Sequence, residues 1–255
     1  MSVARLQENI RKKKTPVALG LSPEEGRLDG RYLKNFTDMY GECPMAHAEA
    51  LRYHGSQTIS AAAERLPAVM LQAEPYLQWG FMGMDVLCNL VNMAKSQGMY
   101  VIVDARCARP RVWTEGGVCA DAATVLPYDG TECCNAGEDK LAVAAVRTVE
   151  AGAATVQNLM AGDRPLYLAA ADQMARAGAA LLLETGYSLD VREMRSKLPG
   201  AFLVLTHCDG ENALPAFDEL GRGALVVEDA IQYAENPGEA AECAVKDMKK
   251  LVQIL

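Results

Sequence analysis

Eight short apolar runs recur along the 255-residue chain, and helix-spaced apolar positions separate most of them. Short runs that are apolar throughout are typical of strands buried on both faces of a parallel sheet. The predicted strands are 16–21, 68–72, 100–104, 122–126, 141–146, 179–183, 201–205 and 223–227. The predicted helices are 2–13, 79–97, 165–177, 191–198 and 238–254, and a long loop with helical character covers 29–65.

Strands that alternate with helical segments favour an α/β fold with a parallel sheet. Eight repeats in about 250 residues favour a closed (β/α)8 barrel over an open doubly wound sheet. No G-x-G-x-x-G follows the first run, which weakens the dinucleotide-binding alternative. We therefore predict that residues 1–255 form a single (β/α)8 TIM barrel domain with a short N-terminal helix at about 2–13.

The run at 100–104 changes abruptly from apolar residues to charged ones. It ends in Asp104, and Arg106, Cys107 and Arg109 follow within five residues. Barrels and open α/β sheets place their chemistry at the carboxyl ends of the strands. These four side chains are therefore the first candidates for a functional site.

Composition limits the classes of partner. A formal charge of −8 argues against a nucleic-acid surface, and no apolar run approaches the ~20 residues of a membrane span. The basic cluster near the N-terminus has no apolar stretch after it, so we do not expect a signal peptide. Eight cysteines with irregular spacing and no C-x-x-C indicate reduced thiols, and hence a cytoplasmic protein.

Short motifs that occur in order along almost the whole chain resemble those of the orotidine 5′-monophosphate decarboxylase family. The stretches that carry the resemblance are GLSP at 20–23 (GLDP in the family), AVMLQ at 68–72 (AVKPQ), DARCAR at 104–109 (D-x-K-x-x-D), TVLPYDG at 124–130 (TVNPYLG), VRTVEA at 146–151 (VRTSNP) and GRGAL at 221–225. The resemblance implies the same barrel, a carboxy-lyase activity in pyrimidine (UMP) biosynthesis, and a homodimer.

The catalytic positions that the resemblance implies are altered. The family uses a Lys-Asp-Lys-Asp set, and those positions fall at Met70, Asp104, Arg106 and Arg109. Only Asp104 keeps its residue type. Arg106 stands where a lysine protonates the carbon that loses carbon dioxide, and a guanidinium that stays charged is a poor proton donor. We expect Asp104 to form an ion pair with a neighbouring arginine.

The implied ligand-binding positions are altered too. Ser22 replaces the aspartate that contacts ribose, and Val149 replaces the serine that contacts the pyrimidine. The phosphate-binding arginine falls at Asp229, beside Glu228, and carboxylates repel phosphate. Arg147 keeps the arginine of the VRT motif.

Three hypotheses follow for function. The first is a diverged family member without decarboxylase activity, acting as a scaffold or regulatory subunit or on another ligand. The second is an active orotidylate decarboxylase. The third is an anion-binding module that uses Arg106, Arg109, Arg111 and Arg147, unless these pair with Glu74, Asp104, Glu150 and Glu184. We expect a homodimer, and an intact decarboxylase is a further candidate partner. We expect binding neither to nucleic acid nor to a membrane.

Thiols and a histidine offer two other sites. His207 and Cys208, together with Cys107 and the Cys133–Cys134 pair, could meet at the barrel top and suit zinc. Their spacing contains no compact ligand pair, so we predict no metal and no cofactor. Cys208 beside His207, or Cys107 between arginines, could act as a nucleophile.

Overall fold

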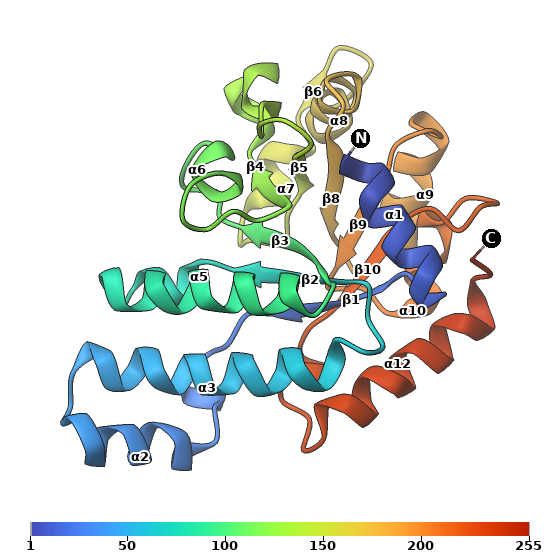
Figure 1. Cartoon of the computed structure of the whole chain (residues 1–255). Helices are drawn as coiled ribbons and strands as arrows, with labels where there is room; N and C mark the ends of the chain where they lie inside the picture. Colours follow the sequence, from blue (N-terminus) through green and yellow to red (C-terminus); the bar gives the residue numbers. More distant parts are fainter. Residues whose placement is uncertain (1, 255) are drawn as a thin grey trace.

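The computed structural model describes residues 2–254, and these form a closed barrel of parallel strands (Figure 1). Around the barrel the strands follow the order β1-β10-β9-β8-β5-β4-β3-β2, with β2 pairing back to β1. The predicted barrel is confirmed, and each predicted strand lies within two residues of an observed one at both ends. The strands are β1 (Val17–Leu21), β2 (Ala68–Gln72), β3 (Tyr100–Asp104), β4 (Ala122–Val125), β5 (Leu141–Arg147), β8 (Ala180–Glu184), β9 (Leu203–Thr206) and β10 (Ala224–Val227).

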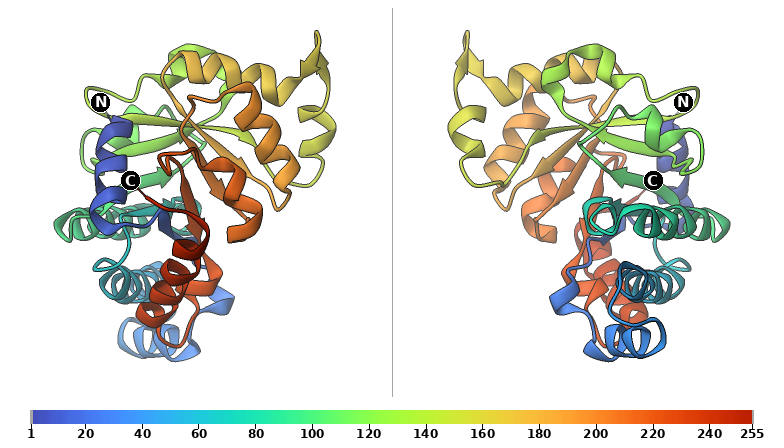
Figure 2. Two further views of the ribbon diagram at one scale, coloured as in Figure 1. Left: turned by 90° about the vertical axis from the view of Figure 1, so that its right-hand side faces the viewer. Right: turned by 90° about the vertical axis from the view of Figure 1, so that its left-hand side faces the viewer.

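Helices surround the barrel, with α3 beside α5 and α12 along β1 (Figures 1 and 2). The longer ones are α1 (Ser2–Lys13), α2 (Gly30–Tyr40), α3 (Pro44–Ala62), α5 (Gly80–Ser96), α8 (Leu166–Arg176), α9 (Ser188–Lys197) and α12 (Pro237–Leu251). Short helices of about one turn lie in the loops that follow several strands. The α-helical ones are α4 (Glu74–Leu77), α6 (Arg111–Thr114), α7 (Ala153–Gln157), α10 (Gly210–Ala213) and α11 (Asp229–Gln232), and the 3-10 helices are η1 (Glu25–Arg27), η2 (Pro127–Asp129), η3 (Thr131–Cys134) and η4 (Leu214–Ala216). Within the described residues no helix has the length and apolar character that crossing a membrane requires.

A small hairpin was not predicted. It pairs β6 (Met160–Ala161) with β7 (Arg164–Pro165) in antiparallel fashion, and Figure 2 shows it projecting with α7 from the body. Gly162 at its turn has a φ of +73°, a left-handed conformation that glycine adopts without strain.

The strands are mostly apolar because they are buried on both faces, and most of their polar residues stand at the carboxyl ends, as Gln72, Asp104, Arg147, Glu184 and Thr206 do. One face packs against the helices, and the other fills the barrel with Ala18, Met70, Ile102, Ala122, Val143, Leu182, Val204 and Val226. Leu6 and Ile10 of α1 join this interior cluster. Asn9 of the same helix donates hydrogen bonds to the carbonyls of Pro67 and Gly98, just before β2 and β3 begin. Helix α1 therefore closes the amino-terminal end of the barrel, and the carboxyl-terminal end remains as the place for a site.

Candidate functional site: an acidic cavity at the mouth of the barrel

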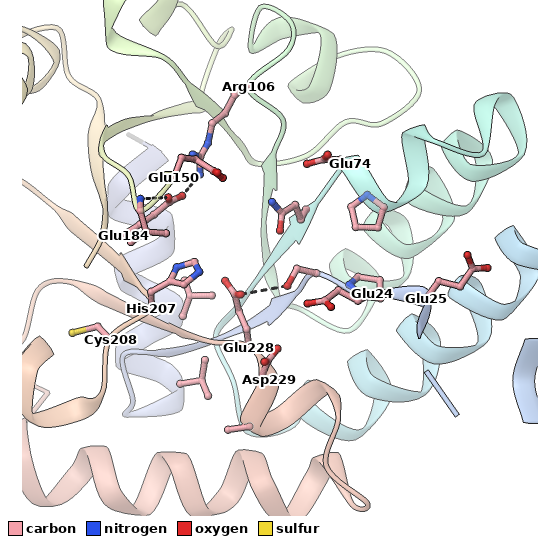
Figure 3. A pocket seen from close by; sticks show the side chains of 18 of the residues that line it. Glu24, Glu25, Glu74, Arg106, Glu150, Glu184, His207, Cys208, Glu228 and Asp229 are labelled. Carbon is pink, nitrogen blue, oxygen red and sulfur yellow. Dashed lines mark hydrogen bonds and ion pairs between the residues drawn. The ribbon is translucent and has the colours of Figure 1, made fainter. Parts of the chain in front are cut away.

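A cavity of about 750 Å³ lies at the carboxyl ends of the strands (Figure 3). Its lining includes seven carboxylates, the cation Arg106 and the imidazole of His207. The carboxylates are Glu24, Glu25, Glu74, Glu150, Glu184, Glu228 and Asp229, and they follow or end strands on several sides of the barrel. A large concave site at this end of a barrel is the default position for a ligand, and the charge of this one is strongly negative.

Arg106 is held between two carboxylates. Its Nε donates to Asp104 Oδ1 at 3.1 Å and its Nη2 donates to Asp104 Oδ2 at 2.9 Å, while Nη2 also contacts Glu184 Oε1. The Asp104 and Glu184 side chains are only 10% and 8% exposed. Burial lowers the pKa of Arg106, but the two carboxylates raise it more, so the guanidinium stays charged. The predicted ion pair of Asp104 is confirmed.

Neighbouring groups fix both carboxylates. Thr124 Oγ1 on β4 donates to Asp104 Oδ1 at 2.7 Å, and the Val149 amide donates to Glu184 Oε2 at 3.3 Å. Arg106, Asp104 and Glu184 therefore form one charge-assisted network across β3, β4 and β8. Three hydrogen bonds to Asp104 and two contacts to Glu184 hold the network in place, so Asp104 serves as one half of an ion pair with a structural role.

The opposite wall of the cavity carries Glu228, which stands beside Ser22. Ser22 Oγ donates to Glu228 Oε2 at 3.3 Å, and the Ser22 amide donates to Gln232 Oε1 at 3.1 Å. Burial raises the pKa of Glu228, while His207 opposes this shift electrostatically. His207 has a left-handed φ of +56°, and Figure 3 shows its imidazole on the side of the cavity that carries Glu228. Non-glycine residues in this conformation are uncommon and concentrate at functional sites.

Asp229, at the position implied for phosphate binding, pairs with a cation that sequence reasoning did not find. Arg27 Nη1 on η1 donates to Asp229 Oδ2 at 2.8 Å, and the Arg27 guanidinium lies 4.0 Å from the centroid of the Tyr233 ring. Arg27 also donates to Glu24 at 3.3 Å. The cation nearest to this position is thus shared between two carboxylates.

The predicted ligand-binding residues do not all reach the cavity. Ser22, Val149 and Asp229 line it, but Met70 is 5% exposed and packs among the apolar side chains inside the barrel. Arg147 donates to Asp190 Oδ2 at 3.3 Å and to Asn158 Oδ1 at 3.0 Å instead of lining the cavity.

The four arginines therefore do not form a cluster. Arg106 pairs with Asp104 and Glu184 as predicted, but the predicted partners of Arg147 and Arg111 were wrong, because Arg111 pairs with Glu115 at 2.9 Å. Arg109 is exposed and lies outside the lining of the cavity.

The thiols likewise do not meet. His207 and Cys208 line the cavity, whereas Cys107 is exposed beside a neighbouring hollow and Cys133 and Cys134 pack against α8. Burial, helped by Asp209, raises the pKa of Cys208 to about 11. A thiol that stays protonated is a poor nucleophile. Among the described residues no three His, Cys, Asp or Glu side chains are grouped to hold a metal ion.

Cys208 is expected to react slowly with iodoacetamide because little of it is thiolate at pH 8. We expect its alkylation rate to be at least about tenfold below that of Cys243, which is exposed on α12. Peptide mass spectrometry after timed quenching measures both rates in one sample. A rate for Cys208 equal to or above that of Cys243 would restore it as a candidate nucleophile.

No protein-family model and no curated protein matches the sequence, whereas solved structures match almost its full length. The orotidine 5′-monophosphate decarboxylase of Plasmodium berghei superposes with a TM-score of 0.83 at 13% identity, covering 98% of both chains. The fold is therefore similar to that of the orotidine 5′-monophosphate decarboxylases. The OMP decarboxylase of Leishmania donovani gives 0.78 at 20% identity, again covering 98% of both chains.

The orotidine 5′-monophosphate decarboxylase of Methanocaldococcus jannaschii is also similar, with a TM-score of 0.64 at 15% identity over 91% of this chain and 98% of that one. Likeness at such identities establishes the fold. The likeness to these barrels extends over almost the whole chain, and the acidic cavity described above lies at the mouth of the barrel.

Proposed function

We propose that this chain is a diverged member of the orotidylate decarboxylase family that lacks orotidylate decarboxylase activity and serves another ligand or a protein partner. One observation carries the proposal. Arg106, at the position that the motif resemblance assigns to the proton-donating lysine, is paired with both Asp104 and Glu184.

Decarboxylation requires a proton that can be released in this position. Loss of carbon dioxide leaves an electron pair on carbon, and a nearby acid must supply the proton that replaces the carboxyl group. A guanidinium does not give up its proton in proteins, and the pKa of Arg106 is raised further by its two carboxylate partners. Arg109 carries the opposite charge to the aspartate expected in its place, and Met70 supplies no charge.

The lining of the cavity also opposes the substrate itself. Orotidine 5′-monophosphate carries a carboxylate and a phosphate, and like charges separated by a few ångströms in a partly enclosed site repel by several kcal/mol. Glu228 and Asp229 stand at the implied phosphate position, and Arg27 is already shared between Asp229 and Glu24. The charge of the cavity therefore favours neutral or cationic ligands over this nucleotide.

Neither alternative hypothesis gains support from the geometry. An active decarboxylase would need another proton donor near Arg106, and the groups that face it are the carboxylates Asp104 and Glu184. An anion-binding module would need convergent arginines, and Arg111 and Arg147 are paired elsewhere. Homodimerisation, expected from the motif resemblance, remains part of the proposal.

Turnover of orotidine 5′-monophosphate tests the proposal. The purified protein is mixed with the nucleotide, and the loss of its ultraviolet band is followed beside the Leishmania donovani enzyme as a positive control. We expect no loss above the protein-free rate. Turnover above that background, if abolished by Asp104→Asn, would overturn the proposal; turnover that survives this substitution would point to a contaminating enzyme and require repurification.

A further inference from the structure

Three sulfur atoms meet on the outside of the barrel, away from the cavity. Cys133 and Cys134 are adjacent residues of η3, and Met174 lies on α8. Met174 Sδ is 3.9 Å from Cys133 Sγ and 3.5 Å from Cys134 Sγ. We call Cys133, Cys134 and Met174 the sulfur triad.

The spacing within the sulfur triad suits a metal ion of low coordination number. Metal–sulfur bonds of ~2.3 Å, the length of zinc–thiolate bonds, place three sulfurs of a trigonal site ~4 Å apart. The two distances to Met174 Sδ are within half an ångström of this value. Small rotations of the three side chains would therefore bring all three sulfurs into bonding distance of one ion.

The sulfur triad is buried on one side and partly exposed to solvent on the other. Met174 is fully buried and Cys133 is 5% exposed, so their sulfurs are shielded from water. Cys134 is partly exposed and stands next to exposed residues, including Glu132 and Asn135. An ion can therefore reach Cys134 from solvent and settle against Cys133 and Met174.

We propose that the sulfur triad binds a single cuprous ion, Cu(I), through two thiolates and one thioether. Thiolate and thioether ligands select soft ions such as Cu(I), whereas harder divalent ions prefer nitrogen and oxygen ligands. The thioether of Met174 is the feature that favours Cu(I) over zinc. The site is separate from the barrel mouth and does not depend on the proposed function.

Binding must displace two protons. A cysteine thiol is ordinarily protonated at neutral pH and binds a metal as the thiolate. One Cu(I) then forms two copper–thiolate bonds and one copper–thioether bond, two protons leave to solvent, and the site changes from neutral to a charge of −1. Copper stays cuprous, so the step needs no oxidant or reductant.

An anaerobic titration tests the proposal. Cu(I) is supplied as its acetonitrile complex in the presence of bicinchoninate, a coloured chelator that suppresses weak binding to the other thiols. We expect the protein to withdraw one equivalent of copper, and Cys133→Ser/Cys134→Ser to withdraw none. Met174→Leu is expected to weaken binding at least tenfold, and X-ray absorption of the wild-type complex is expected to show three sulfur ligands.

Control variants distinguish Cu(I) binding at the sulfur triad from Cu(I) binding to other cysteine thiols. Cys243→Ser and Cys43→Ser remove thiols outside the triad and are expected to bind as the wild type does. Met174→Leu keeps apolar volume and is expected to fold, because methionine–leucine exchanges are tolerated in protein interiors; circular dichroism checks this. Two results would overturn the proposal. One is wild-type protein that fails to withdraw Cu(I) from bicinchoninate, and the other is a Met174→Leu variant that binds Cu(I) as tightly as the wild type.

Discussion

Replacement of Arg106 by alanine is expected to lower the free energy of unfolding by about 3–5 kcal/mol. The substitution leaves Asp104 and Glu184, both about nine-tenths buried, without the cation that each contacts. Removing one partner of a buried charge network is costly because the remaining charges lose both water and their counterion. Urea denaturation followed by circular dichroism measures the change, provided that the slope with denaturant stays constant.

Arg111→Ala is the matched control for this experiment. Arg111 forms an ion pair with Glu115 at 2.9 Å, but both side chains are exposed, at 55% and 42%. Exposed pairs of this kind contribute about 0–1 kcal/mol. A loss below about 1 kcal/mol for Arg106→Ala would show that Arg106 is not held as an ion pair with a structural role.

Acidification is expected to destabilise the protein through His54 by about 3 kcal/mol between pH 7.5 and pH 4. His54 is 8% exposed on α3, its Nε2 has no hydrogen-bond partner within the described residues, and its ring lies 5.9 Å from that of Tyr233. Burial lowers its pKa from 6.5 to about 4. The unfolded chain therefore binds a proton on His54 at a higher pH than the folded protein does.

The direction of the change in stability with pH follows from this difference in the pKa of His54 between the folded and unfolded states. The contribution of neutral His54 is complete above about pH 6.5 and is lost as pH falls towards 4. Comparing the unfolding free energy of wild type and His54→Leu across this range cancels the contributions of the carboxylates. We expect the gap between the two proteins to shift by about 3 kcal/mol in favour of the variant. A gap that does not change with pH would show that His54 does not titrate in this way.

The barrel could be predicted from the sequence because buried parallel strands give uninterrupted apolar runs. The pairing of Asp104 with Arg106 could be predicted as well, because the two residues lie at one strand end. The partner of Arg147 could not. The register of β5 against β8 shifts between Ala145 and Arg147, and such irregularities re-aim a side chain, here towards Asp190.

Other features of the site depend on contacts between distant parts of the chain. Arg27 and Asp229 are 202 positions apart, and nothing in the local sequence of either residue indicates the other. Glu24 and Glu25 are different, because they follow Ser22-Pro23 directly after the first strand and could have been assigned to the barrel mouth by the strand-end rule. The short hairpin of β6 and β7 has too few residues to give a periodic pattern.

Binding of uridine 5′-monophosphate tests the central proposal most directly, namely that a barrel like that of the orotidylate decarboxylases carries an acidic mouth that does not accept their nucleotide. This product needs no proton donor, so its binding depends only on the cavity. In calorimetric titrations at low ionic strength, with the Leishmania donovani enzyme as a positive control, we expect no saturable binding up to millimolar nucleotide. Saturable one-to-one binding at micromolar concentrations, displaced by orotidine 5′-monophosphate, would contradict the account.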